Sequence, residues 1–173
     1  MSAVTQSILE DEARDGSHGR IAGHVVAHTS GATALTATQL EERATIHRGS
    51  TARPEVDAFR ELRTRLLAAM EGTFVALVVP VSAGSGGSFV ARNLATAMAF
   101  DESRSALLVD CDLRHPSQHA TMRIDASAGG LVEYLENPDG DLSDVVYETG
   151  VNGLSLIPAG TSREVGAEYF SSV

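Results

Sequence analysis

The chain has 173 residues, of which 43% are apolar, and this is enough for one domain of ordinary size with a tail. Its formal net charge of −10 argues against a general surface for nucleic acid or anionic membranes, because phosphate contacts need clustered basic residues. The single cysteine, Cys111, the absence of a signal-peptide pattern and the lack of an apolar run of about 20 residues predict a cytoplasmic protein.

The first segment, residues 1–52, is predicted to be a flexible tail. It mixes small, polar and acidic residues without a sustained hydrophobic period, apart from a short apolar stretch at Ile21–Val26 and a brief helix expected around Ala37–Ala44. Four of the six histidines lie in this tail, namely His18, His24, His28 and His47. Their irregular spacing, with no cysteine or carboxylate cluster beside them, argues against a metal site.

The domain is expected to occupy residues 53–173 and to begin with an amphipathic helix at Pro54. Apolar residues then recur at helical spacing until Gly72: Val56, Phe59, Leu62, Leu66, Leu67 and Met70. Asp57, Arg60 and Arg63 recur on one flank beside this stripe. That flank is either an ordinary solvated face or a contact with a partner, since arginine pairs with carboxylates through two parallel hydrogen bonds.

A buried strand is predicted at Phe74–Val79, followed by a glycine-rich turn and a helix over about Ser88–Phe100. Strand, glycine turn and helix form the layout of a phosphate cradle, in which backbone N–H groups surround the phosphates. In such a loop a lysine spans the β and γ oxygens, and the next Ser or Thr hydroxyl holds Mg²⁺.

The loop matches this layout only in part. Gly84, Gly86 and Ser88 fit, but Val81 stands at the first glycine position and Gly87 stands at the lysine position. The chain contains no lysine, because all 13 basic positions are arginine. The alternative is a glycine-rich strand-to-helix turn that binds no nucleotide.

A second buried strand is predicted at Ala106–Cys111, with two carboxylates at its end. Asp110 and Asp112, separated by one residue at a strand terminus, can share a metal ion or orient a water molecule. Alternatively, they cap the following turn or pair with Arg114.

Short helices at Leu131–Leu135 and Asp141–Val146 and a third strand at Leu154–Pro158 complete the predicted elements. Strands that alternate with helices predict an α/β fold with a mostly parallel sheet, covered by helices on both faces as in three-layer P-loop NTPases. Ligand groups are then expected at the carboxyl ends of the strands, where the glycine loop and Asp110 fall.

From Asp57 to Ser172 the chain resembles the catalytic domain of the bacterial tyrosine kinases (BY-kinases) of capsular and exopolysaccharide biosynthesis, which belong to the ParA/MinD-like P-loop superfamily. The segment Leu107–Arg114, with Pro116 and His119 after it, is similar to the second Walker motif of these kinases. The helix at Asp57 is similar to the family's Glu-x-x-Arg-x-x-Arg helix, with Asp in place of Glu.

The resemblance implies ATP and Mg²⁺ as cofactors. It implies nucleotide binding by Gly84, Ser85, Gly86, Gly87, Ser88 and Phe89. It also implies metal binding by Ser88 and Asp110, ancestral catalytic roles for Asp110 and Asp112, and an interface at Asp57, Arg60 and Arg63. The implied partners are a membrane chain-length regulator (polysaccharide co-polymerase), an active kinase homologue or a further copy of this chain, but no nucleic acid.

The chain also departs from the family. Besides the missing lysine, it stops at Val173, before the aliphatic strand that ends in the Walker B aspartate, and it has no C-terminal tyrosine cluster. The expected fold is therefore truncated, and a sheet without that strand would expose apolar backbone. Losing two charged groups of the phosphoryl-transfer site, at about 3 kcal/mol or more each, would slow the chemistry by four or more orders of magnitude.

The sequence therefore predicts a tyrosine-kinase-like protein that is catalytically deficient, binds nucleotide weakly or not at all, and serves as a docking or regulatory subunit. A partner is expected to recruit it to the inner face of the membrane. The alternative is a weak ATPase or protein-tyrosine kinase that is completed in trans by a partner subunit.

Overall fold

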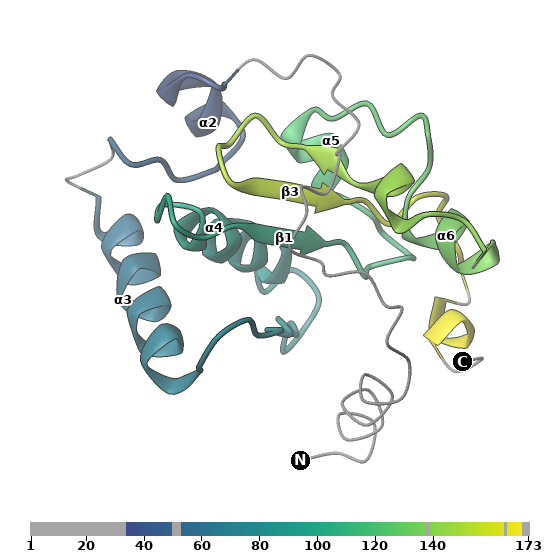
Figure 1. Cartoon of the computed structure of the whole chain (residues 1–173), viewed down its shortest axis with the longest axis horizontal. Coiled ribbons are helices and arrows are strands. Elements are labelled where there is room, and N and C mark those ends of the chain that lie inside the picture. Colours follow the sequence, from purple (N-terminus) through teal and green to yellow (C-terminus); the bar gives the residue numbers. More distant parts are fainter. Residues whose placement is uncertain (1–33, 50–52, 138, 165, 171–173) are drawn as a thin grey trace.

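The computed structural model describes residues 34–49, 53–137, 139–164 and 166–170 (Figure 1). In chain order its elements are α2 (Ala37–Glu42), α3 (Pro54–Ala69), α4 (Gly87–Met98), β1 (Ala106–Val109), α5 (Gln118–Met122), α6 (Leu131–Glu136), the 3₁₀ helix η1 (Leu142–Val145), β2 (Tyr147–Glu148), β3 (Leu154–Ile157) and the 3₁₀ helix η2 (Gly166–Phe170). None of the helices in this part of the chain has the length and apolar content that a membrane crossing requires.

The sheet has the strand order β1-β3-β2. Strand β1 runs parallel to β3, with Ala106 opposite Leu154, whereas β2 is antiparallel to β3. The sheet is therefore mixed rather than mostly parallel. The reason is the short connection from Glu148 to Leu154, since a parallel pair needs a crossover of a dozen or more residues.

Helices cover both faces of β3, as the alternating pattern predicts. Leu154 and Leu156 pack in one cluster with Leu108 of β1 and Met122 of α5. Ile157 lies on the opposite face, in a cluster with Val145 and Val146 and against Leu131 and Tyr134 of the α6 region. The fold is an α/β arrangement with a small sheet at its centre.

Helix α4 stands between the sheet and α3 (Figure 1). Its Leu94 and Ala97 pack with Val56 and Phe59 of α3, and its Ala91 and Ala95 pack against the cluster of the sheet. A helix that is apolar on two sides can bridge two layers. Helix α4 therefore fixes the glycine loop, which immediately precedes it, relative to the end of β1.

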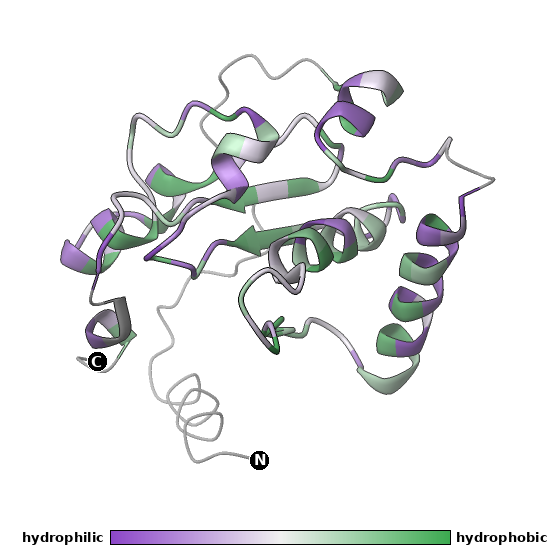
Figure 2. Cartoon of the chain, turned by 180° about the vertical axis from the view of Figure 1, so that it is seen from behind, coloured by the Kyte–Doolittle hydropathy of each residue, from purple (hydrophilic) through white to green (hydrophobic). Residues whose placement is uncertain are grey.

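The predicted strand at Phe74–Val79 is wrong. This segment is assigned to no strand, its hydrophobic residues lie apart from the sheet (Figure 2), and Val75, Leu77 and Val79 are 92%, 80% and 67% exposed. Its β-branched composition favours an extended backbone, but a strand also needs a hydrogen-bonded neighbour. No residue in the described ranges pairs with it.

The apolar stripe of α3 is buried only in its first half. Val56 and Phe59 are buried, whereas Leu62 and Met70 are 37% and 44% exposed. Helical spacing correctly predicts the helix, but it does not show how far along its length another layer covers it.

The domain boundary predicted at residue 52 does not separate the core from the tail. Ile46 is buried in the cluster of α3 and α4, and its backbone N–H donates to Asn93 Oδ1 at 2.7 Å. Asn93 in turn donates to the carbonyl of Ala44 at 3.1 Å. Residues 44–46 thus belong to the packed domain, while residues 1–33 of the predicted tail lie outside the described residues.

Candidate functional site

The glycine loop forms a turn whose geometry depends on two glycines. Gly84 and Gly86 have φ values of 75° and 86°, and a Cβ added at either would meet no atom within 4 Å. Gly86 is the N-cap of α4, and its carbonyl accepts from Val90 N at 2.9 Å. Within the described ranges, no acceptor is paired with the backbone N–H groups of Gly87, Ser88 and Phe89. These N–H groups at a helix N-terminus make a cradle for an anion.

The lysine position of the loop offers little room for a side chain. A Cβ on Gly87 would lie 3.1 Å from Pro80 Cβ and 3.4 Å from Pro80 Cδ. Gly87 therefore fits beside Pro80, where the side chain of a larger residue would be crowded.

Arg92, on α4 beyond Gly87, does not replace the missing lysine. It is only 4% exposed, and its guanidinium donates to Gln118 Oε1 and to the carbonyl of Ala44, both at 3.3 Å. Burial among these neutral groups lowers the pKa of Arg92. Its charge is directed towards α5 and residue 44, not towards the loop.

Asp110 holds together the turn that follows β1. It is 4% exposed, and its carboxylate accepts three backbone N–H groups, from Asp112 at 3.2 Å, Ser117 at 3.1 Å and Gln118 at 3.0 Å. Asp112 is exposed and accepts from His115 N at 2.9 Å. Both carboxylates therefore cap the turn, which was the alternative to metal binding. Arg114 pairs with neither of them in these contacts and instead donates to the carbonyl of Glu164 at 3.1 Å.

Gln118 connects the glycine loop to the turn after β1, a role that no sequence pattern indicates. Its side chain donates to the carbonyl of Ser88 at 2.9 Å, while its backbone N–H donates to Asp110. The first turn of α4 and the end of β1 are thus brought together by this side chain, although the segment before the glycine loop forms no strand. A glutamine after Pro116-Ser117 carries no distinctive sequence signal.

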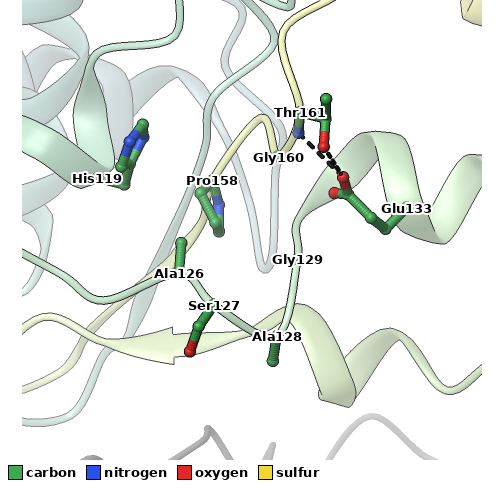
Figure 3. Close-up of a pocket in the computed structure, with 9 residues that line it drawn as sticks. All are labelled: His119, Ala126, Ser127, Ala128, Gly129, Glu133, Pro158, Gly160 and Thr161. Carbon is green, nitrogen blue, oxygen red and sulfur yellow. Dashed lines mark hydrogen bonds between the residues drawn. The ribbon is translucent and has the colours of Figure 1, made fainter.

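A cavity of about 350 Å³ opens beside this turn, at the carboxyl end of β3 (Figure 3). Its lining residues are His119, Ala126, Ser127, Ala128, Gly129, Glu133, Pro158, Gly160 and Thr161. Glu133 closes one side, because its carboxylate accepts from Gly130 N at 2.7 Å and Thr161 N at 3.0 Å. Burial opposes ionisation of Glu133, but the hydrogen bonds from Thr161 and Gly130 outweigh it and lower its pKa. No sequence pattern indicates this role of Glu133.

Known proteins with related sequences are tyrosine kinases. The chain is 32% identical over 120 residues to the tyrosine-protein kinase ptk of Acinetobacter johnsonii, covering 68% of this chain and 16% of that protein. It is 28% identical over 102 residues to the tyrosine-protein kinase CpsD of Streptococcus agalactiae, covering 59% of this chain and 44% of that protein. No protein-family model matches the sequence.

Solved structures agree with the sequence relatives. The kinase domain of the Escherichia coli tyrosine kinase ETK superimposes with a TM-score of 0.62 at 28% identity, over 80% of this chain and 57% of that one. The BceF tyrosine kinase domain gives a TM-score of 0.60 at 29% identity, over 82% of this chain and 60% of that one. The chain is a homologue of the bacterial tyrosine-protein kinases. It spans less than half the length of the kinases ptk and CpsD.

ATP and Mg²⁺, which kinases use in general, fit the residues of this site unequally. The free N–H groups of Gly87, Ser88 and Phe89 fit a phosphate, and the Ser88 side chain is exposed beside them. The metal fits poorly, because Asp110 is already committed to three N–H groups. No group of three or more His, Cys, Asp or Glu side chains in the described part of the chain is arranged to hold a metal ion. The described residues therefore fit a phosphate but not the metal ion that phosphoryl transfer uses.

The predicted kinase interface lies on α3, away from the loop. Arg60 contacts Asp57 Oδ1 at 3.4 Å and the carbonyl of Arg48 at 3.4 Å. Arg63 lies 3.9 Å from Asp101, in the connection between α4 and β1. Asp57 is exposed and both arginines are partly exposed, so the flank combines intramolecular pairs with accessible charge.

Proposed function

We propose that this chain is a catalytically deficient tyrosine-kinase-like P-loop protein of exopolysaccharide or capsule biosynthesis, acting as a docking or regulatory subunit. The observation that carries the proposal is Gly87, at the position of the loop cation and close against Pro80. The pathway rests on the resemblance to the BY-kinases and on the homology to tyrosine-protein kinases.

Phosphoryl transfer relies on positioning and on neutralising the charge of the phosphoryl oxygens. Losing one such clamp costs about 3 kcal/mol, or roughly a hundredfold in rate. Arg92 supplies no replacement because its donors go to Gln118 and Ala44, and Asp110 is engaged by backbone N–H groups. The two effects together leave little catalytic power in the chain alone.

Docking is assigned to the flank of Asp57, Arg60 and Arg63 on α3. Its exposed charges suit a partner that presents carboxylates and guanidinium groups in turn. The partner is a membrane chain-length regulator, an active kinase homologue or a further copy of the chain, and it would hold the protein at the cytoplasmic face of the membrane.

A second candidate function is a weak ATPase or tyrosine kinase that a partner subunit completes. The N–H groups of Gly87, Ser88 and Phe89, which have no acceptor among the described residues, favour it because they leave a phosphate cradle open at the start of α4. In this case the partner would supply the cation that Gly87 does not offer.

The test is calorimetric titration of the purified chain with ATP and Mg²⁺, after a cooperative thermal melt has shown that it is folded. We expect no binding in the micromolar range. The variant Gly87→Lys with Pro80→Gly restores the cation and removes the ring atoms that would crowd its Cβ. We expect this variant to bind at least tenfold more tightly, since a charged hydrogen bond contributes about 1.5–3 kcal/mol.

The matched control is Gly87→Ala with Pro80→Gly, which adds the Cβ without the charge. Micromolar affinity of the unaltered chain would contradict the proposed deficiency. Absence of binding by the chain alone, followed by ATP hydrolysis when an active kinase homologue is added, would favour the second candidate function.

A further inference from the structure

Residues 34–49, which include α2 and precede α3, are held against α4, and we call them the arm. Thr45 and Ile46 of the arm are buried, and Ile46 packs with Leu94 of α4. The arm therefore shares its core with the helix that carries the phosphate cradle.

A buried amide, the side chain of Asn93, joins the arm to the first turn of α4. Asn93 is 0% exposed, and its Oδ1 accepts from Ile46 N at 2.7 Å. Its Nδ2 donates to two carbonyls, that of Ala44 at 3.1 Å and that of Phe89 at 3.0 Å. An amide side chain offers two donors and one acceptor oxygen, so both ends of Asn93 are engaged. Because an unpaired polar group inside a core is costly, the arm and the first turn of α4 hold each other in place.

A second connection runs from the arm to the same turn through Arg92 and Gln118. Arg92 donates to the carbonyl of Ala44 and to Gln118 Oε1, both at 3.3 Å. Gln118 Nε2 donates to the carbonyl of Ser88 at 2.9 Å. Both connections therefore begin at the carbonyl of Ala44 and end on carbonyls of the first turn of α4.

These two carbonyls determine how the N–H groups of the cradle point. A peptide group is planar, so the carbonyl of Ser88 and the N–H of Phe89 turn together. The carbonyl of Phe89 shares its plane with the N–H of Val90, which donates to the carbonyl of Gly86 at 2.9 Å. The carbonyl of Gly86 in turn shares its plane with the N–H of Gly87. The arm thus helps to set the directions of the first and third N–H groups of the cradle.

The arm makes these contacts in a backbone conformation that alanine rarely adopts. Ala44 has a φ of 47°, in the left-handed region, where the Cβ atom comes close to the backbone. The conformation costs free energy, and it is held because the carbonyl of Ala44 accepts from both Asn93 and Arg92. The side chain of Ala44 is exposed, so a substitution there acts on the backbone and leaves the core unchanged.

We propose that Asn93 and Gln118 are positioning residues that couple docking of the arm to anion binding at the phosphate cradle. The coupling rests on the cradle of the proposed function and regulates that same site, because a shift of the arm changes the affinity for a phosphate group. It is reciprocal, so a bound phosphate also stabilises the docked arm.

The test is residue-resolved amide hydrogen exchange by NMR on the full chain, in a buffer without phosphate or nucleotide. In the variant Ala44→Val, the branched side chain disfavours the left-handed conformation. We expect the amides of Ile46 and Val90 to exchange at least tenfold faster than in the unaltered chain. The amide of Leu131 in α6, which donates to the carbonyl of Pro158 at 2.8 Å, should keep its rate and reports that the domain remains folded.

Ala44→Gly is the matched control, because glycine adopts the left-handed conformation without strain and keeps the carbonyl. Both amides should exchange no faster in this variant than in the unaltered chain. The three chains are then titrated with inorganic phosphate at constant ionic strength, with the amide signals of Gly87, Ser88 and Phe89 as the readout. We expect Ala44→Val to bind phosphate at least threefold more weakly than the unaltered chain, and Ala44→Gly to bind it no more weakly.

An unchanged rate at Val90 in Ala44→Val, whatever the rate at Ile46, would overturn the proposal, because the arm would then move independently of the first turn of α4. Equal phosphate affinities in the three chains, or no phosphate binding by any of them, would also overturn it. The exchange rates are measured without a ligand. Their failure is therefore distinct from a micromolar affinity for ATP and Mg²⁺, which would contradict only the proposed catalytic deficiency.

Discussion

At the scale of single residues, Asp110 has a structural role that can be separated from any role in metal binding. Asp110→Ala would leave the N–H groups of Asp112, Ser117 and Gln118 without their acceptor in a buried turn. Hydrogen bonds to charged groups contribute about 1.5–3 kcal/mol each, and neighbouring losses are not additive. We expect the free energy of unfolding to fall by about 3 kcal/mol, as measured by urea denaturation.

The neighbouring carboxylate provides the control. Asp112 is exposed and accepts one N–H group, from His115, so Asp112→Ala should cost no more than about 1 kcal/mol. Equal losses for the two variants would show that the three N–H groups do not anchor the turn.

At the scale of elements, the start of α6 depends on the ionised form of Glu133. Its carboxylate accepts from Gly130 N, which begins the helix, and from Thr161 N, which follows β3. The pKa of Glu133 is lowered, because the hydrogen bonds from Thr161 and Gly130 outweigh the opposing effect of burial. The unfolded chain therefore binds this proton more readily than the folded one. The resulting stabilisation is complete above the ordinary glutamate pKa of about 4.3 and is lost as the pH falls through the lower folded value.

The prediction is measured as the unfolding midpoint between pH 3 and pH 6. The unaltered chain should gain stability as the pH rises through this window, and Glu133→Gln should show a smaller rise. Glu148→Gln, which removes an exposed carboxylate on β2, is the matched control. An identical slope for the Glu133 variant and the unaltered chain would refute the linkage.

Sequence patterns predicted those elements whose cause is local. The helical spacing of apolar residues predicted α3, the glycine turn before a helical stretch predicted α4, and short aliphatic runs between turn residues predicted β1 and β3. Phe74–Val79 has the same aliphatic character as β1, yet it forms no strand, because pairing depends on a neighbour elsewhere in the chain. The residues of the site also divide into those with a local cause and those that depend on distant contacts. The glycines at positions 84 and 86 were predictable from their turn, whereas Gln118 and Glu133 act through contacts that no local pattern contains.

At the scale of the whole molecule, two exposed surfaces differ in their chemistry. The exposed side chains of Val75, Leu77, Val79 and Val81 lie before the glycine loop, whereas the charged flank of Asp57, Arg60 and Arg63 lies on α3 beside its own buried stripe. The first surface is apolar and makes no backbone hydrogen bond to another backbone group within the described residues. The second presents paired charges and suits a reversible contact between folded surfaces. Docking of this protein should therefore depend on salt and on the arginines of α3.

The corresponding prediction concerns self-association. Arg60→Glu with Arg63→Glu should abolish it, because reversing both charges leaves Asp57 and Asp101 facing like charges and removes the donors offered to a partner. Sedimentation velocity over a range of protein concentrations, at low and at physiological salt, measures the effect. Arg65→Glu is the matched control, because Arg65 pairs with Glu61 at an exposed position outside this flank. An unchanged sedimentation profile in the double variant, relative to an unaltered chain that associates, would assign self-association to another surface. A loss that also occurs in Arg65→Glu would trace it to net charge instead of to the flank.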